Sequence, residues 1–254
     1  MTVTSATRAA DGGKSSTQFE QDEIVWLWAN KTDDTEYIKA WKLTAQSGGS
    51  LTGSSAKYWP SDGSSLNVYA LHGNFKNPSI TEGTTSWSSL TSLTHTVEAD
   101  QSTDENKRLS DLLYSHPLSA FAPNNTVQLI FDHLLAKITV KLDLKNSKGI
   151  NEGELANAEV TLTNIQPEAT ISKMSLTGNS DKTSTTGTRT TITSGKIPSS
   201  INSDNVIGSA IVPLQHFGGG NSNPADDNVI TITLASPDNR SFSYKPTSPV
   251  ALTA

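Results

Sequence analysis

The sequence predicts an all-β protein built from antiparallel β-sandwiches, and three observations predict it. Short stretches in which apolar and polar residues alternate recur along the chain. Gly, Pro, Asn and Asp separate these stretches, as they do where turns connect strands. No long window keeps apolar side chains at the three- and four-residue spacing of a capped helix. Many short strands with this punctuation favour layered antiparallel sheets.

The clearest predicted strand covers Lys137 to Leu144. Its apolar residues Ile138 and Val140 alternate with Lys137 and Thr139, which is the pattern of a strand with one buried face. The same pattern, less regular, predicts strands at Tyr37–Thr44, Leu66–Leu71, Val127–Phe131, Val160–Thr163, Val206–Val212, Val229–Leu234 and Ser241–Tyr244. One or two helical turns are expected only at Arg108–Tyr114, with Ser110 or a neighbour as the cap.

The stretch from Ile24 to Trp28 is apolar on both faces. Two interpretations remain open. It is either a central strand covered on both sides, or a strand whose tryptophans form an exposed row that stacks on sugars. In the second interpretation Trp26, Trp28 and the more distant Trp87 are candidate ligand contacts.

Chain length favours either two domains or one large β domain, because 254 residues exceed the usual length of about 100–200 residues per domain. The stretch Asn146–Glu154 is polar, contains two glycines and follows the clearest strand, so it is the predicted boundary. We therefore expect an N-terminal sandwich at residues 1–145, with residues 1–18 as a flexible leader, and a C-terminal sandwich at residues 146–254.

Charge and composition exclude several classes of protein. The chain has 19 basic and 25 acidic residues, a net charge of −6, and no block of like charges, so nucleic acid is not an expected partner. No apolar run is long enough for a membrane helix, which predicts a soluble or already processed segment. The chain has no cysteine, and 66 of its 254 residues are Ser or Thr, as in many exported β proteins.

Motifs of catalysis are missing from the sequence. No complete phosphate-binding loop or Gly-x-Ser-x-Gly nucleophile elbow occurs. The five histidines do not show the spacing of a zinc helix, and the acidic pairs lack the spaced loop of a calcium site. We expect no cofactor, no metal and no enzymatic activity; a glycosidase is the weakest of the functions considered.

Five motifs follow one another in a fixed order: Phe19–Val25, Tyr58–Pro60, Leu66–Ala70, Asp111–Tyr114 and Val127–Val140. This order resembles the fimbrillin family, which comprises the type V pilins and related surface lipoproteins of anaerobic Gram-negative bacteria. The resemblance runs from about Thr7 to the C-terminus. It implies two tandem transthyretin-like sandwich domains, export to the outer surface, and attachment to the membrane only through a lipid anchor upstream of this sequence.

The resemblance also implies a route of assembly. In the family, an Arg-specific protease removes the first strand, and a strand from a neighbouring subunit fills the groove, which gives a head-to-tail polymer. Arg8, in Thr7-Arg8-Ala9, lies where the family has the cleaved arginine. The alternative is that Arg8 is a solvated charge in a disordered terminus. Members continue beyond the equivalent of Ser248–Ala254, so we expect either a truncated C-terminal domain or an accessory or tip subunit that donates no strand.

Two functions from different classes follow. The first is a structural subunit or adhesin of fimbriae whose partners are other pilin subunits. The second is a surface module that binds a host protein or a glycan and does not polymerise.

Overall fold

The computed structural model describes residues 1, 3–8, 19–75, 79–116, 119–142, 152–177, 183–197, 206–219, 227–235, 238–248 and 250–253. The protein is all-β, as predicted, and its chain forms two compact units. The first unit comprises residues 1–95, 112–134 and 171–182, and the second comprises residues 96–111, 135–170 and 183–254. The predicted boundary after residue 145 falls among residues 143–151, outside the described residues, and stays a prediction.

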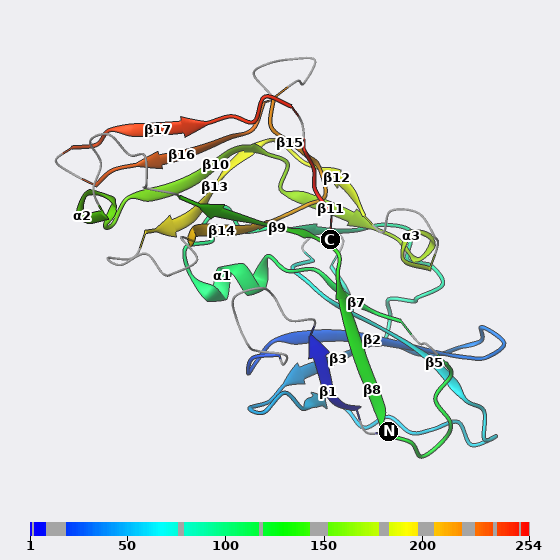
Figure 1. Ribbon diagram of the computed structural model, residues 1–254. Coiled ribbons are helices and arrows are strands. Elements are labelled where there is room, and N and C mark those ends of the chain that lie inside the picture. Colours follow the sequence, from blue (N-terminus) through cyan, green and yellow to red (C-terminus); the bar gives the residue numbers. More distant parts are fainter. Residues whose placement is uncertain are drawn as a thin grey trace. The chain divides into compact units, whose positions relative to one another are not determined.

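One seven-stranded sheet forms the framework of the first unit (Figure 1). Its strand order is β1-β8-β7-β5-β2-β3-β4. Every neighbouring pair is antiparallel except β1 and β8, which are parallel. The strands are β1 (Val3–Arg8), β2 (Ile24–Lys31), β3 (Glu36–Ala45), β4 (Leu51–Gly53), β5 (Leu66–His72), β7 (Leu113–Ser115) and β8 (Val127–His133). The unit also contains α3 (Lys173–Thr177), and β6 (Leu93–Thr96) ends its first stretch of chain.

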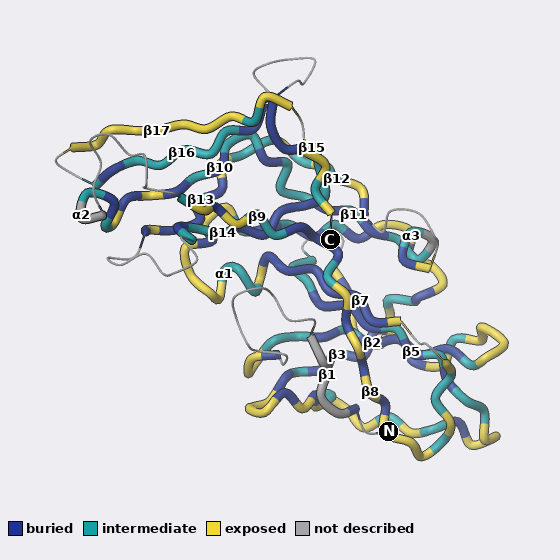
Figure 2. Tube along the Cα trace, in the orientation of Figure 1, coloured by how far each residue is buried: buried dark blue, intermediate teal, exposed yellow. Residues whose placement is uncertain are grey.

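Strand β2 lies in the middle of this sheet, between β5 and β3. Its consecutive residues Leu27 and Trp28 point to opposite faces, and each is 0% exposed. Figure 2 shows β2 in the colours of buried and intermediate residues. This confirms that the Ile24–Trp28 stretch belongs to a central strand covered on both sides. Leu27 lies in the main core cluster of the unit, which also contains Val3, Phe19, Val25, Ala29, Ile38, Trp41, Leu43, Ala45, Leu51, Leu66, Val68, Ala70, Leu113, Val127, Leu129 and Phe131.

Smaller sheets form the second unit. A four-stranded sheet has the order β13-β10-β16-β17, and β9 pairs with β14, β11 with β12 and β15 with β18. The strands are β9 (Ala136–Lys141), β10 (Glu159–Ile165), β11 (Glu168–Ile171), β12 (Ser184–Thr186), β13 (Thr190–Lys196), β14 (Val206–Val212), β15 (His216–Phe217), β16 (Val229–Thr233), β17 (Ser241–Tyr244) and β18 (Val250–Ala251). The helices are α1 (Asp104–Leu109) and α2 (Glu152–Leu155).

Alternation in the sequence produces the core of this unit. Val160 is fully buried in β10 and Val140 is nearly buried in β9, while Thr139 is exposed. Both valines belong to one cluster with Leu155, Ala158, Ile197, Ile207 and Leu234. The predicted strands Val206–Val212 and Ser241–Tyr244 match β14 and β17 residue for residue.

The helix prediction at Arg108–Tyr114 is wrong in position. Helix α1 ends at Leu109, and Tyr114 lies in β7. The helix begins after Thr103, whose hydroxyl accepts a hydrogen bond from the Asn106 N–H at 3.2 Å. Ser110 is the C-terminal rather than the N-terminal cap residue, and its hydroxyl donates to the Asn106 carbonyl at 2.7 Å. The cap at Thr103 therefore starts the helix earlier than predicted, and only its last residue, Leu109, is among the leucines that suggested it.

The expectation of a flexible leader is also wrong over Val3–Arg8, because these six residues form β1. Their sequence has one large apolar residue and no alternation, so its strand character depends on backbone pairing with β8. Residues 9–18 lie outside the described residues. In the described part of the chain, no helix has the length and apolar character needed to cross a bilayer.

Candidate functional site

Strand β1 is the edge of the seven-stranded sheet and the candidate site of assembly. It runs parallel to β8, with Val3 aligned with Val127 and Arg8 aligned with Phe131, and the register shifts between Thr4 and Thr7. Parallel pairing is slightly less stable per residue than antiparallel pairing. Val3 is 4% exposed and lies in the core cluster. The strand is thus held by backbone bonds and by at least one buried side chain.

Strand β8 depends on β1 for much of its pairing. On its other side, β7 is aligned with β8 only at Asp132 and His133. The part of β8 from Val127 to Phe131 therefore has β1 as its strand neighbour within the described residues. Along this part Val127, Leu129 and Phe131 point into the core. Gln128 and Ile130 lie on the opposite, exposed face of the strand, and Ile130 is 54% exposed. Without β1, core side chains and backbone groups of β8 would lie at an open edge.

The opposite edge strand of the sheet, β4, lies close to β1. Strand β4 ends the sheet at the other side, yet β1 contacts β4, and Leu51 of β4 shares the core cluster with Val3. The curvature of the sheet thus brings its two edges together, with β1 between β8 and β4. Loss of β1 would leave a groove bordered by two strands and floored by buried apolar residues.

Phe19, the first described residue after β1, packs against side chains of β5 and β8. Phe19 is 3% exposed, and its ring lies 5.2 Å from the Phe131 ring and 5.1 Å from the His72 ring. The His72 Nδ1 is 2.8 Å from the Ile24 carbonyl oxygen, which fixes that ring against β2. A cut after Arg8 would therefore release β1 while Phe19 and the following strands stay in place.

An unpaired sheet edge of this kind can bind another β-strand. An unpaired edge offers a row of N–H and C=O groups that another extended chain satisfies, and the apolar pockets beside it select the side chains of that chain. Among the described residues, no group of three His, Cys, Asp or Glu side chains is arranged to hold a metal ion.

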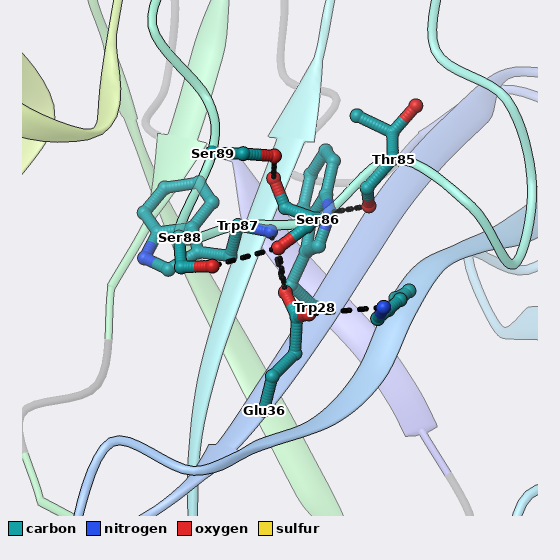
Figure 3. A network of polar contacts seen from close by, with 8 residues as sticks. Trp28, Glu36, Thr85, Ser86, Trp87, Ser88 and Ser89 are labelled. Carbon is teal, nitrogen blue, oxygen red and sulfur yellow. Dashed lines mark hydrogen bonds and ion pairs between the residues drawn. The ribbon is translucent and has the colours of Figure 1, made fainter.

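Two of the predicted tryptophan contacts, Trp28 and Trp87, lie on the other face of the same sheet, around a network anchored by Glu36 (Figure 3). The carboxylate Oε1 of Glu36 accepts hydrogen bonds from the Trp87 backbone N–H at 2.8 Å and the Ser86 hydroxyl at 2.6 Å. Its Oε2 is 3.5 Å from the Lys39 ammonium. The Trp28 indole N–H donates to the Thr85 carbonyl at 2.8 Å. These bonds hold the segment around Trp87 over β2.

Stacked rings continue from Trp87. Its ring lies 5.5 Å from that of Trp28, 4.5 Å from that of Tyr69 and 6.2 Å from that of Tyr114. Burial raises the pKa of the Tyr114 phenol above its usual value, because the ionised form loses solvation. Burial raises the pKa of Tyr69 in the same way, with a smaller contribution from Asp34. The cluster is therefore a second apolar core that covers this face of the sheet.

The structure places the predicted site residues in two separate regions of the first unit. Arg8 is the last residue of β1. Trp28 and Trp87 are brought together but are both 0% exposed, whereas Trp26 is half-buried. A surface ligand does not reach the two buried rings as they lie here, and the ligand-contact hypothesis stays untested. Sequence reasoning missed Glu36, because its role depends on a contact with residues fifty positions away.

Comparisons with known proteins agree with the fold. A profile described as fimbrillin-like matches residues 7–254 of the chain. A crystal structure of a candidate cell adhesion protein from Bacteroides uniformis superposes with a TM-score of 0.60 and 21% identity, over 98% of this chain and 88% of that chain. A second candidate cell adhesion protein, from Bacteroides ovatus, has a TM-score of 0.60 and 15% identity, over 92% and 80% of the two chains.

At these identities the two superpositions establish a shared fold and nothing more. A search of curated proteins found no match. The profile, however, covers nearly the whole length of the chain, from the end of β1 to the last residue. The chain belongs to the fimbrillin-like family.

Proposed function

We propose that this chain is a structural subunit or adhesin of bacterial fimbriae that assembles after proteolytic removal of its first strand. The observation that carries the proposal is the position of β1, which is an edge strand, parallel to β8, and ends at Arg8. A strand from another subunit would replace it. Because the donor and acceptor surfaces differ, such pairing is head-to-tail and does not close, which builds filaments.

Family membership supports the coarser parts of this proposal. A fimbrillin-like chain is expected at the cell surface, in contact with other pilin subunits and without a catalytic role. The finer parts rest on the resemblance: cleavage after Arg8, complementation by a donor strand, two transthyretin-like domains divided near residue 145, and a lipid anchor upstream of the sequence.

Limited digestion with an Arg-specific protease tests the assembly. We expect cleavage after Arg8, release of residues 1–8, and concentration-dependent oligomers by size-exclusion chromatography and native mass spectrometry. An excess of synthetic peptide with the sequence of residues 1–8 should compete for the groove and reduce the oligomers. If the nicked full-length subunit stays monomeric with residues 1–8 released, the proposed assembly is wrong.

Two conservative substitutions provide the controls. Arg8→Lys keeps the positive charge but removes the Arg-specific cleavage site, so it should abolish processing and oligomers together. Arg108→Lys makes the same change in α1 and should leave both unchanged. Oligomers that form equally from the Arg8→Lys protein would show that assembly does not need this cut.

The second candidate function, a surface module that binds a glycan or a host protein, is favoured by one observation. The first unit carries an open cavity lined by the exposed Tyr58 and the half-buried Trp59, at residues that the sequence did not indicate as a binding site. A fimbrial adhesin would combine both functions.

A further inference from the structure

A cavity of about 500 Å³ lies on the first unit, formed by the segment from Tyr58 to Gly63 and by the turn at Pro123 and Asn124. Its volume falls in the range of about 300–1,000 Å³ that is usual for small-ligand sites. Met1 also lines it, and its amino group donates to the Lys57 carbonyl at 2.5 Å.

Aromatic rings form one side of this cavity. Tyr58 is 76% exposed, the highest value among the exposed large apolar side chains of the described residues. Trp59 is half-buried and packs against the core cluster, which leaves part of its surface for the cavity. Tyr37 lies next to Tyr58, since its hydroxyl donates to the Tyr58 carbonyl at 3.0 Å. Tyrosine and tryptophan suit recognition sites because each combines a large apolar ring with a polar group.

Hydrogen-bonded turns hold the walls in place. The Gly63 N–H donates to the Pro60 carbonyl at 3.1 Å, in a turn where Gly63 has a φ of 75°, which favours glycine. On the other side, Leu66 and Phe121 exchange two backbone hydrogen bonds of 2.9 and 2.8 Å, which fix the start of the Pro123 turn. The cavity is therefore formed before any ligand arrives, which lowers the entropic cost of binding.

The polar side chains that line the cavity are uncharged. The lining side chains of Ser61 and Asn124 offer a hydroxyl and an amide, which both donate and accept hydrogen bonds. The nearest acidic side chain in the turn, Asp62, is paired with the Lys31 ammonium at 2.5 Å. Hydrogen bonds from Lys31 and Ser64 lower the pKa of Asp62, so the pair stays ionised and its charges offset each other.

A sugar ring fits this combination of surfaces. One side of a hexose presents C–H groups that pack on an aromatic face, and its rim presents hydroxyl groups that need both donors and acceptors. We propose that this cavity binds a neutral hexose or N-acetylhexosamine residue of a glycan, with Tyr58 as the exposed stacking surface and Ser61 and Asn124 as hydrogen-bonding partners. The proposal deepens the adhesin role and rests on the proposed function.

An array of oligosaccharides that end in glucose, galactose, mannose or N-acetylglucosamine tests the proposal. The best binder is then titrated against the protein and its variants by calorimetry. Tyr58→Ala should weaken binding by roughly tenfold or more, as truncation of a central aromatic residue at an interface does. Tyr58→Phe keeps the ring and should retain most of the affinity. Both variants should melt like the wild type, because the side chain is largely outside the core.

Tyr244→Ala is the matched control, because Tyr244 is a tyrosine of similar exposure, 64%, in the second unit. It should bind the glycan with unchanged affinity. The proposal is overturned if no neutral glycan binds, if Tyr58→Ala binds as tightly as the wild type, or if a proline-rich peptide and not a glycan binds in a Tyr58-dependent way. Glycan binding is measured on unprocessed monomers, so failure here leaves the strand-replacement proposal intact, and failure to assemble leaves this one intact.

Discussion

The two units differ in how many faces of their strands are buried. In the first unit the central strand β2 is apolar on both faces, and adjacent residues such as Leu27 and Trp28 are both fully buried. In the second unit the strand β10 has one apolar face. Val160 of β10 is buried, while its neighbour Thr161 aligns with Thr231 of β16, and both threonines are partly exposed.

The difference shows what each sheet requires from the rest of the chain. A strand with one apolar face needs a core on one side only, and its other face is stable in water. A strand with two apolar faces also needs a cover. In the first unit the segment around Trp87 provides that cover, and the Glu36 carboxylate holds it in position (Figure 3).

The largest effect is expected from a charge in the one-faced core. Val140→Asp places a carboxylate among Leu155, Val160 and Ile207, where it cannot be solvated, at a cost of several kcal/mol. We expect the second unit not to fold, as measured by circular dichroism and urea denaturation. Thr139→Asp, one residue earlier on the exposed face, should fold normally. In β2, by contrast, both Leu27→Asp and Trp28→Asp should prevent folding. A soluble Val140→Asp protein with a cooperative transition would show that this face is not a core.

A smaller effect is expected from removal of the cover. Trp87→Ala deletes a fully buried ring that stacks on Tyr69, and such deletions cost about 3–5 kcal/mol. Trp87→Phe should recover part of the loss, because it restores part of the ring contact. Urea denaturation of both variants measures the difference. A loss below about 1 kcal/mol for Trp87→Ala would mean that this face tolerates water, and that the contrast between the units is weaker than described.

The smallest effect is expected from Tyr114→Phe. The Tyr114 hydroxyl is buried and has no hydrogen-bond partner among the described residues, so its removal should be neutral or stabilising by up to about 1 kcal/mol at neutral pH.

The raised pKa of Tyr114 adds a pH dependence to this prediction. Because the folded-state pKa lies above the unfolded value of about 10, the contribution of the neutral phenol is complete below that pH. It is lost progressively as the pH rises from the unfolded pKa to the folded-state pKa, because the unfolded phenol ionises first. The wild type should therefore lose more stability than Tyr114→Phe between about pH 8 and pH 11, as urea denaturation would show. An equal loss in both proteins would mean that the phenol is solvated.

Strands with clear alternation could be predicted from the sequence, because a strand with one buried face has an apolar residue at every second position. Val127–Phe131 lies within β8 for this reason, since its residues alternate between buried and exposed. The covered position of Ile24–Trp28 was also predictable, since two apolar faces need two covers. Helix α1 was misplaced although its signal was present: Thr103 followed by two acidic residues is a typical N-terminal cap.

The functional regions were harder to predict, because they depend on contacts that leave no local pattern. In strand β1 the one side chain whose burial is described, Val3, is buried, and the strand is defined by its pairing with β8. The Glu36 network joins residues far apart in the sequence. The aromatic cavity had a partial signal, since Tyr58 and Trp59 precede a turn that ends at Gly63. Their exposure, however, is set by the tertiary structure.

Hydrogen exchange of β8 amides tests the central claim, that β1 is a separable strand whose place another strand can take. The protein is measured before and after cleavage at Arg8 with removal of residues 1–8. The account predicts that Val127–Phe131 are protected in the intact protein, lose protection once β1 has left, and regain it in the oligomer. Unchanged protection of these amides in the monomer without residues 1–8 would contradict it.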